Sequence, residues 1–298
     1  AARLNAQALG ESLREVGITV NCLPLLDVRQ PETVAAIGDR AMGSEPMQVA
    51  ALGRAVIDGQ TRGGVASVIK HMPGHGRAIV DSHMELPKVS ASREELEIDV
   101  APFKALSTAP MGMTAHIVYE AWDSTHCASL SPKIIDEVIR GQIGFDGLLF
   151  SDDLDMKALS GDVPTRARDV VAAGCDIALN CWGRMDEMTG IANLLGDISD
   201  KGRARLNEAM MVTSSYEEAE MAELLSRRDA LIAAAAWWPS STPHERVFSS
   251  LPKMLQRMNR SRSTSMGGKV RSICCSPWRA IRKSICARFP SWHWCSNI

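Results

Sequence analysis

Two short segments of the sequence concentrate side chains that can move protons or attack an electrophile. The first, KHMPGHGRAIVDSH at 70–83, contains three histidines and Asp81, which stands two residues before the last of them. The second, SDDLDM at 151–156, contains three carboxylates. A carboxylate can act as a nucleophile, and a histidine beside a carboxylate can act as a general acid and base. If the two segments meet on one face of the fold, they predict a nucleophile and an acid/base pair.

The same residues could instead bind a metal ion or do no chemistry. His71 and His75 have the spacing of helical zinc ligands, but Pro73 and Gly74 lie between them and disfavour a helix. The carboxylates at 151–156 could form a magnesium site or cap the next helix. The histidines could simply be hydrogen-bonded in a polar loop. Because no HExxH motif, cysteine ligand set or phosphate-binding glycine loop is present, we expect no metal and no cofactor.

The segments between these motifs alternate between strands and helices up to about residue 195. Apolar runs predict five strands, at 18–28, 65–71, 111–117, 147–153 and 175–181. The spacing of apolar residues predicts helices near 46–62 and 131–141, and a capping box of Ser92 and Glu95 predicts the start of another. We expect Pro102 to divide that last helical region. Apolar strands separated by helices are typical of a parallel sheet buried on both faces.

Polar residues lie at the carboxyl ends of the predicted strands. They are Asp27, Lys70 with His71, His116, Asp152 with Asp153, and Asn180. In a (β/α)8 barrel these ends form the active-site face, whereas a doubly wound sheet usually binds its ligand at one switch point. Polar residues at five successive ends therefore favour the barrel. The predicted fold class is α/β, a (β/α)8 TIM barrel of which only the last five βα units are present.

The order of these motifs resembles one known family. The strings KHMPGHG and DSH, followed by FSDDLDM, resemble the bacterial β-N-acetylhexosaminidases of glycoside hydrolase family 3 that act in cell-wall recycling. PLLDV, IGDRAMG and AGCDIALNC are similar to the same family, so the resemblance covers about residues 1–195. It implies a cytoplasmic retaining hydrolase without a cofactor. Its small carbohydrate substrate would be a peptidoglycan fragment with terminal β-linked N-acetylglucosamine and 1,6-anhydro-N-acetylmuramic acid.

The resemblance also implies roles for individual side chains. Asp152 resembles the catalytic nucleophile, and His83 resembles the acid/base, with Asp81 as the partner that orients its ring. The residues that resemble sugar-binding residues are Arg40, Lys70 and His71. These roles agree with the chemistry, because glycoside cleavage builds positive charge that a carboxylate can trap. An imidazole can donate and accept a proton near neutral pH. Met72 stands where the family usually has phenylalanine.

Several alternatives remain open on the sequence alone. Asp152 could cap a helix, and Arg40 could form a surface ion pair. We expect His116 and Asp27 to line the pocket, without a defined chemical role. Trp122 could stack on a sugar or simply pack in the core. The chain could also be a β-glucosidase or a phosphorylase of the same superfamily, or a catalytically dead truncated relative.

We expect three regions along the chain: a partial catalytic domain at 1–200, a helical continuation at 201–230, and an atypical basic tail at 231–298. Residues 246–298 contain 11 basic and no acidic residues, but they have no helix or strand period. We therefore expect the tail to be disordered or translated out of frame, and not to bind nucleic acid. No apolar run is long enough to span a membrane, so no membrane association is expected.

The five predicted strands resemble the fourth to the eighth of the family's barrel. We therefore expect a chain truncated at its amino terminus, without counterparts of the first three strands. An incomplete barrel exposes strand edges. This predicts a chain that is unstable or inactive by itself.

Overall fold

The computed structural model describes residues 1–236, so the predicted basic tail lies outside the described residues from position 237 onward. Residues 2–224 form one compact unit. Residues after 224 group separately, and those described belong to helix α7 (Met221–Ala236). The fold that positions the candidate site lies entirely within the first of these units.

A parallel sheet forms the centre of this unit. Its strands are β1 (Val20–Asn21), β2 (Ala66–Met72), β4 (Met111–Thr114) and β6 (Leu148–Phe150), and they pair in the order of the chain. Ile177 pairs with Phe150 in parallel and adds a fifth segment beyond β6. Within this sheet each strand therefore pairs with the next sheet strand along the chain, as in a (β/α)8 barrel, while β3 and β5 lie outside it. The α/β fold class is confirmed, as are the first four predicted strands, while the fifth predicted strand contributes only the parallel bridge at Ile177.

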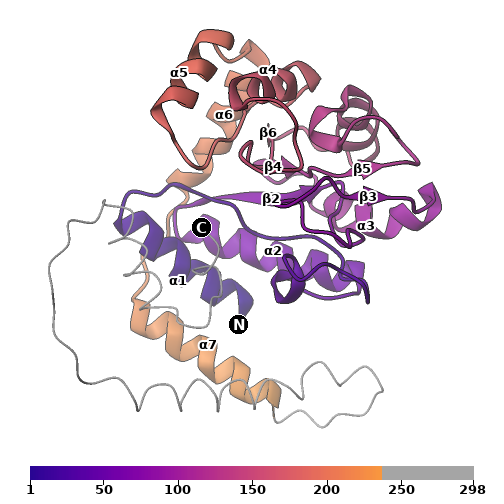
Figure 1. Ribbon diagram of the computed structural model, residues 1–298. Coiled ribbons are helices and arrows are strands. Elements are labelled where there is room, and N and C mark those ends of the chain that lie inside the picture. The colour runs from indigo at the N-terminus through magenta and orange to yellow at the C-terminus, as the bar shows by residue number, and fades with distance from the viewer. Residues whose placement is uncertain (237–298) are drawn as a thin grey trace, which may run out of the picture. The chain divides into compact units, whose positions relative to one another are not determined.

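Helices connect the strands. They are α1 (Ala2–Glu15), α2 (Pro46–Arg62), α3 (Arg93–Ala105), the π-helix η3 (Ile134–Gln142), α4 (Val163–Ala173), α5 (Met185–Leu194) and α6 (Asp200–Met211). Short 3-10 turns are η1 (Gly38–Arg40), η2 (Ala128–Leu130) and η4 (Val212–Ser214), and β3 (Lys88–Val89) pairs with β5 (Val118–Tyr119). Figure 1 shows β2 lying along α2 and α3.

Helix α3 begins at the predicted capping box, but it is not divided at Pro102 as predicted. Ser92 Oγ accepts a hydrogen bond from the Glu95 N–H, and the Glu95 carboxylate accepts one from the Ser92 N–H. The helix then continues through Pro102 to Ala105, so the predicted division is wrong. Buried Val100 and Phe103 flank the proline, and their packing outweighs the hydrogen bond that proline cannot make.

The two faces of the sheet have different partners. Ile69 and Leu149 pack in the cluster that contains the connecting helices, including Phe103. Val68 and Leu148, one residue earlier on the same strands, pack in a second cluster together with α6. Side chains alternate between faces along a strand. Lys70 follows Val68 by two residues, and Asp152 follows Phe150 by two. Both are therefore expected on the same face of the sheet as Val68 and Phe150.

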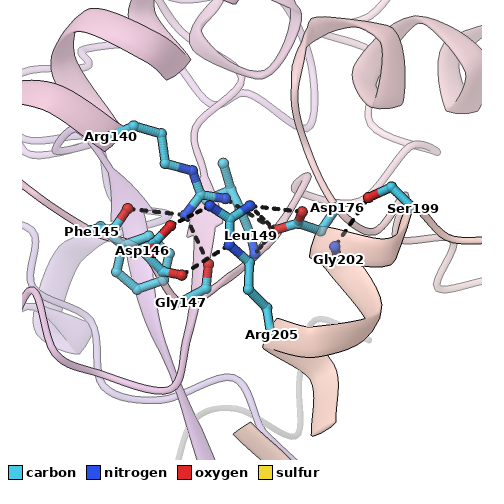
Figure 2. Close-up of polar contacts among 9 residues, drawn as sticks. All are labelled: Arg140, Phe145, Asp146, Gly147, Leu149, Asp176, Ser199, Gly202 and Arg205. Carbon is cyan, nitrogen blue, oxygen red and sulfur yellow. Dashed lines mark hydrogen bonds and ion pairs between the residues drawn. The ribbon is translucent and has the colours of Figure 1, made fainter. Parts of the chain in front are cut away.

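Hydrogen bonds and ion pairs around Asp176 hold helix α6 near the amino-terminal ends of the last strands (Figure 2). The Asp176 carboxylate accepts hydrogen bonds from Arg140 at 3.0 Å, from Arg205 at 3.0 Å and from the Leu149 N–H at 2.9 Å. Arg205 also pairs with Asp146. Because these contacts lie at the starts of the last strands, they support the sheet from the end away from the predicted site.

Candidate active site

Asp27 is the centre of a buried hydrogen-bonded group at the carboxyl end of the first strand segment. Its Oδ2 accepts a hydrogen bond from Nδ1 of His71 at 2.8 Å. Its Oδ1 accepts from the backbone N–H groups of His71, at 3.1 Å, and of His75, at 2.7 Å. Burial alone raises the pKa of Asp27, but the charge and hydrogen bond of His71, together with the hydrogen bond from the His75 N–H, hold it below its usual value. The ionised carboxylate orients His71 and leaves Nε2 of that ring available.

His75 occupies the interior of the same group and connects it to the following loop. Its ring lies 5.4 Å from that of His71, centroid to centroid, and its Nε2 lies 3.3 Å from Oγ of Ser82. Burial, together with the charge of His71, lowers the pKa of His75 to about 4. The ring is therefore neutral near pH 7. Ser82 lies between Asp81 and His83 in the chain. The contact between His75 and Ser82 therefore helps to fix the loop that carries the candidate acid/base pair.

The loop after β2 is pressed closely onto the chain before it. A Cβ atom at Gly76 would lie 1.8 Å from the backbone oxygen of Val28, so only glycine fits there. Oγ1 of Thr33 donates to the Gly76 oxygen at 2.6 Å, and the hydroxyl of buried Tyr119 donates to the Gly74 oxygen at 2.8 Å. The glycines in the PGHG string therefore serve close packing, which fixes the start of this loop.

Asp81 and His83 form a pair near the surface, as their spacing predicts. Oδ1 of Asp81 accepts hydrogen bonds from Nδ1 of His83 at 2.8 Å and from its backbone N–H at 2.9 Å. Burial raises the pKa of Asp81, but the hydrogen bonds from His83 lower it further, and the net pKa is below the usual value. The His83 side chain is 59% exposed, so Nε2 of this ring can reach a bound molecule.

Backbone hydrogen bonds join the Asp81–His83 loop to the loop that carries Asp152. The N–H of Ala158 donates to the Ser82 oxygen at 3.2 Å, and the N–H of Lys157 to the His83 oxygen at 3.4 Å. The two motifs are about 70 positions apart in the sequence, yet they meet at one edge of the sheet. The loop with Asp81 and His83 therefore contacts the segment that follows Asp152.

Asp152 lies directly after β6 and is half-buried. Burial raises its pKa, but the charges of His71 and Lys70 and the hydrogen bond from the Asp153 N–H lower it below the usual value, so the carboxylate is ionised near pH 7. Its Oδ1 accepts a hydrogen bond from the Asp153 N–H at 2.9 Å. The helix-capping alternative does not hold, because the next helix, α4, is capped by Asp162.

The three predicted sugar-binding residues have different surroundings. Lys70 and His71 are buried on β2, and both influence Asp152 electrostatically. Arg40 ends η1, and its Nη1 donates to the Ala36 oxygen at 2.9 Å. Among residues 1–236 it forms no ion pair, and its Nε is buried without a hydrogen-bond partner. The structure brings Lys70 and His71 to the site but gives no contact between Arg40 and Asp152.

Several residues have roles that the sequence did not define. Asp27 orients His71 rather than only lining a pocket, and His116 contacts the Asp153 backbone at 3.1 Å. Trp122 is 6% exposed and packs against Tyr119, with ring centroids 5.5 Å apart, so it belongs to the core. The sequence indicated His116 only by its position at the end of a predicted strand. Its hydrogen-bond partners could not be predicted, because they come from segments distant in sequence.

Two properties of the described residues concern metals and membranes. Among residues 1–236, no group of three or more histidine, cysteine, aspartate or glutamate side chains is arranged to hold a metal ion. Within the same range, no helix combines the length and apolar character that crossing a membrane requires.

Comparisons with known proteins agree on one family. The model of the glycosyl hydrolase family 3 N-terminal domain matches residues 1–213. A β-hexosaminidase of Alkalilimnicola ehrlichii is 41% identical over 178 residues, which cover 58% of this chain and 51% of the relative. The chain thus spans about half the length of such curated relatives.

Solved structures agree with this assignment. The structure of a glycoside hydrolase family 3 β-N-acetylglucosaminidase from a Paenibacillus species has a TM-score of 0.66 and 29% identity, covering 76% of this chain and 48% of that one. NagZ from Neisseria gonorrhoeae, in complex with N-trifluoroacetyl-D-glucosamine, has a TM-score of 0.64 and 33% identity, covering 76% and 64%.

Proposed function

The chain belongs to glycosyl hydrolase family 3, and we propose that it carries the catalytic residues of a retaining β-N-acetylhexosaminidase. The observation that carries this proposal is the meeting of the Asp81–His83 loop with the Asp152 loop, through the backbone contacts of Ala158 and Lys157. These contacts support the proposal, because they join the loop with a histidine and its carboxylate partner to the loop that follows Asp152. The substrate would carry a terminal β-linked N-acetylglucosamine.

Asp152 is the proposed nucleophile. Its carboxylate attacks the anomeric carbon and forms a glycosyl-enzyme ester while the bond to the leaving oxygen breaks. The low pKa of Asp152 suits this role, because the group is ionised at neutral pH. The positive charges around it also help it to leave again when water hydrolyses the ester.

His83 is the proposed acid/base. Its Nδ1–H donates to Asp81, so Nε2 is the atom that transfers the proton. In the first step Nε2–H protonates the leaving oxygen, and in the second Nε2 takes a proton from the attacking water. The ionised Asp81 stabilises the imidazolium and holds the ring in place. The exposure of His83 suits a group that must reach the leaving sugar.

The proposed sugar contacts are Lys70, His71 and Arg40. Lys70 and His71 come from the buried end of β2 beside Asp152, where charged and polar donors can bind hydroxyl or carbonyl oxygens. Arg40 is proposed as a sugar contact because its Nε is buried without a hydrogen-bond partner among residues 1–236. The proposed natural substrate is a 1,6-anhydro-muropeptide fragment, and the proposed place of the reaction is the cytoplasm.

Turnover of 4-nitrophenyl N-acetyl-β-glucosaminide tests this proposal. We would compare the chain with an extended protein, in which the first three βα units of a relative precede it. Turnover by either form supports the hydrolase proposal, and turnover by neither overturns it. Turnover by the chain alone at the rate of the extended protein would contradict the expectation that the chain is inactive by itself.

Two further measurements separate the related activities. Added phosphate should not accelerate turnover, whereas a phosphorylase would become faster. The corresponding glucoside should be a poor substrate, whereas a β-glucosidase would prefer it. Either opposite result would replace the proposed reaction by that alternative.

A further inference from the structure

His116 is a fully buried histidine that the proposed chemistry does not use, and it contacts the segment that carries Asp152. Its Nε2 lies 3.1 Å from the backbone oxygen of Asp153, and its Nδ1 lies 2.8 Å from Oγ of Ser129. His116 follows β4, and Asp153 follows β6, the neighbouring strand. The imidazole therefore connects the ends of two adjacent strands at the site.

The partners of this ring determine where its proton lies. A backbone carbonyl can only accept a hydrogen bond, so Nε2 must carry hydrogen. Burial lowers the pKa of His116, and the ring is neutral near pH 7. Nδ1 consequently accepts from the hydroxyl of Ser129. The Thr114 hydroxyl, 2.6 Å from Oγ of Ser129, then donates to that oxygen.

These bonds form a directed chain from Thr114 through Ser129 and His116 to the carbonyl of Asp153. Thr114, Ser129 and His116 are each 0% exposed, so water does not compete for these groups. Ser129 Oγ also lies 3.1 Å from the Ala115 oxygen, but its single proton serves only one of the two acceptors at a time.

Three hydrogen bonds fix the position of Asp153, the residue after Asp152. Its N–H donates to the Asp152 carboxylate at 2.9 Å, its own Oδ1 accepts from the Cys181 N–H at 3.0 Å, and its carbonyl accepts from His116. We infer that His116 is a positioning residue that fixes the Asp153 peptide and, through it, the direction of the Asp152 carboxylate. This inference rests on the proposed role of Asp152 as nucleophile. It assigns His116 no contact with the substrate.

Substitution of His116 tests this role in whichever form turns over the aryl glycoside. In His116→Leu we expect kcat to fall roughly 30-fold with little change in KM, because a small misplacement of a reacting group is costly. His116→Gln keeps an amide N–H near the position of Nε2, so its kcat should stay within roughly fivefold of wild type. His126→Leu is the control, because that ring is 58% exposed and, among residues 1–236, its ion pair is with Asp123 alone.

Three results would overturn the inference. One is an unchanged kcat in His116→Leu. Another is an equal loss in the leucine and glutamine variants. The third is a loss explained by unfolding, which a thermal melt of each variant would reveal. If wild type itself shows no turnover in either form, the proposed function fails, and the inference fails with it.

A second measurement does not depend on activity. Nitrogen NMR of the histidine rings in the chain should show His116 with hydrogen on Nε2 and none on Nδ1. Ser129→Ala should change the Nδ1 signal of this ring and leave that of His126 unchanged. A proton on Nδ1 of His116 in the wild-type chain would overturn the hydrogen-bond directions on which the inference stands.

Discussion

Asp152 carries the largest share of the proposed chemistry, so its removal gives the clearest prediction. Asp152→Ala should lower kcat by roughly 100-fold or more, because a nucleophile acts on the chemical step. Steady-state turnover of the aryl glycoside measures this loss. Asp169→Asn is a matched control, because within the described part of the chain Asp169 forms just one ion pair, an exposed one with Arg168. A kcat within twofold of wild type in Asp152→Ala would remove Asp152 from the nucleophile role.

His75 makes the stability of the fold depend on pH. Its pKa of about 4 is below the unfolded value, so the unfolded chain binds a proton first as the pH falls. The stability it contributes is complete above about pH 6.5 and is lost as the pH falls toward 4, by up to ~3 kcal/mol. Asp99 acts in the opposite direction, since burial raises its pKa to about 6, and it partly offsets the loss.

Urea unfolding at pH 7 and pH 4.5 isolates this contribution. The free energy of unfolding of His75→Gln should change less between the two pH values than that of wild type, because Asp99 is common to both. If the two proteins lose the same free energy on acidification, His75 is not the neutral buried group described above.

At the residue scale, the sequence predicted pairs close in the chain and missed distant ones. The Asp81–His83 bond was predictable from the spacing of two residues, although the chain turns there, since the Met84 N–H donates to the Asp81 oxygen at 2.9 Å. The bond between Asp27 and His71 spans 44 residues, and that between His116 and Asp153 spans 37. Such contacts depend on strand register and loop paths, which residue spacing alone does not define.

The loop after β2 is the element whose backbone position matters most to the site. In Gly76→Ala the new methyl group would meet the Val28 oxygen, so the loop must move. We expect the free energy of unfolding to fall by about 2 kcal/mol, and kcat to fall with it as His83 is displaced. Gly196→Ala is the control, since a Cβ there has no neighbour within 4 Å. Equal stability of the two variants would contradict this account of the loop.

At the element scale, apolar runs predicted the first four strand positions because parallel strands are buried on both faces. The helix predicted near 131–141 is also present, and Ser131 caps its start, since its Oγ accepts a hydrogen bond from the Ile134 N–H at 3.1 Å. The division of α3 at Pro102 was wrong, because local propensity does not include the packing of Val100 and Phe103. Where tertiary burial is strong, it overrides a single unfavourable residue.

At the scale of the whole molecule, the described unit is an ordered series of five parallel segments rather than a closed barrel. The face of the sheet that carries Val68 and Leu148 is covered in part by α6, through Leu206, Ala209 and Met210. The sequence predicted a helical continuation after 200 but not its position against the sheet. That position depends on Arg205, whose partners Asp146 and Asp176 lie far earlier in the chain.

The network around Asp176 should therefore support the unit as a whole. Asp176→Asn would leave Arg140 and Arg205 facing each other without the carboxylate between them, and their repulsion would add to the lost hydrogen bonds. Breaking such a buried pair typically costs about 3 kcal/mol or more. Arg168→Met, which removes an exposed ion pair, should cost less than about 1 kcal/mol.

Urea unfolding combined with hydrogen exchange distinguishes how far this support extends. If Asp176 stabilises the whole unit, Asp176→Asn should lower protection equally in α6 and in β2 and β4. If it only fastens α6, exchange should rise in residues 200–211 while the strands keep their protection. We expect the first result, because Asp176 binds the β6 backbone and the Arg140 of η3 as well as α6. A loss of protection confined to α6 would show that the Asp176 network stabilises only that helix.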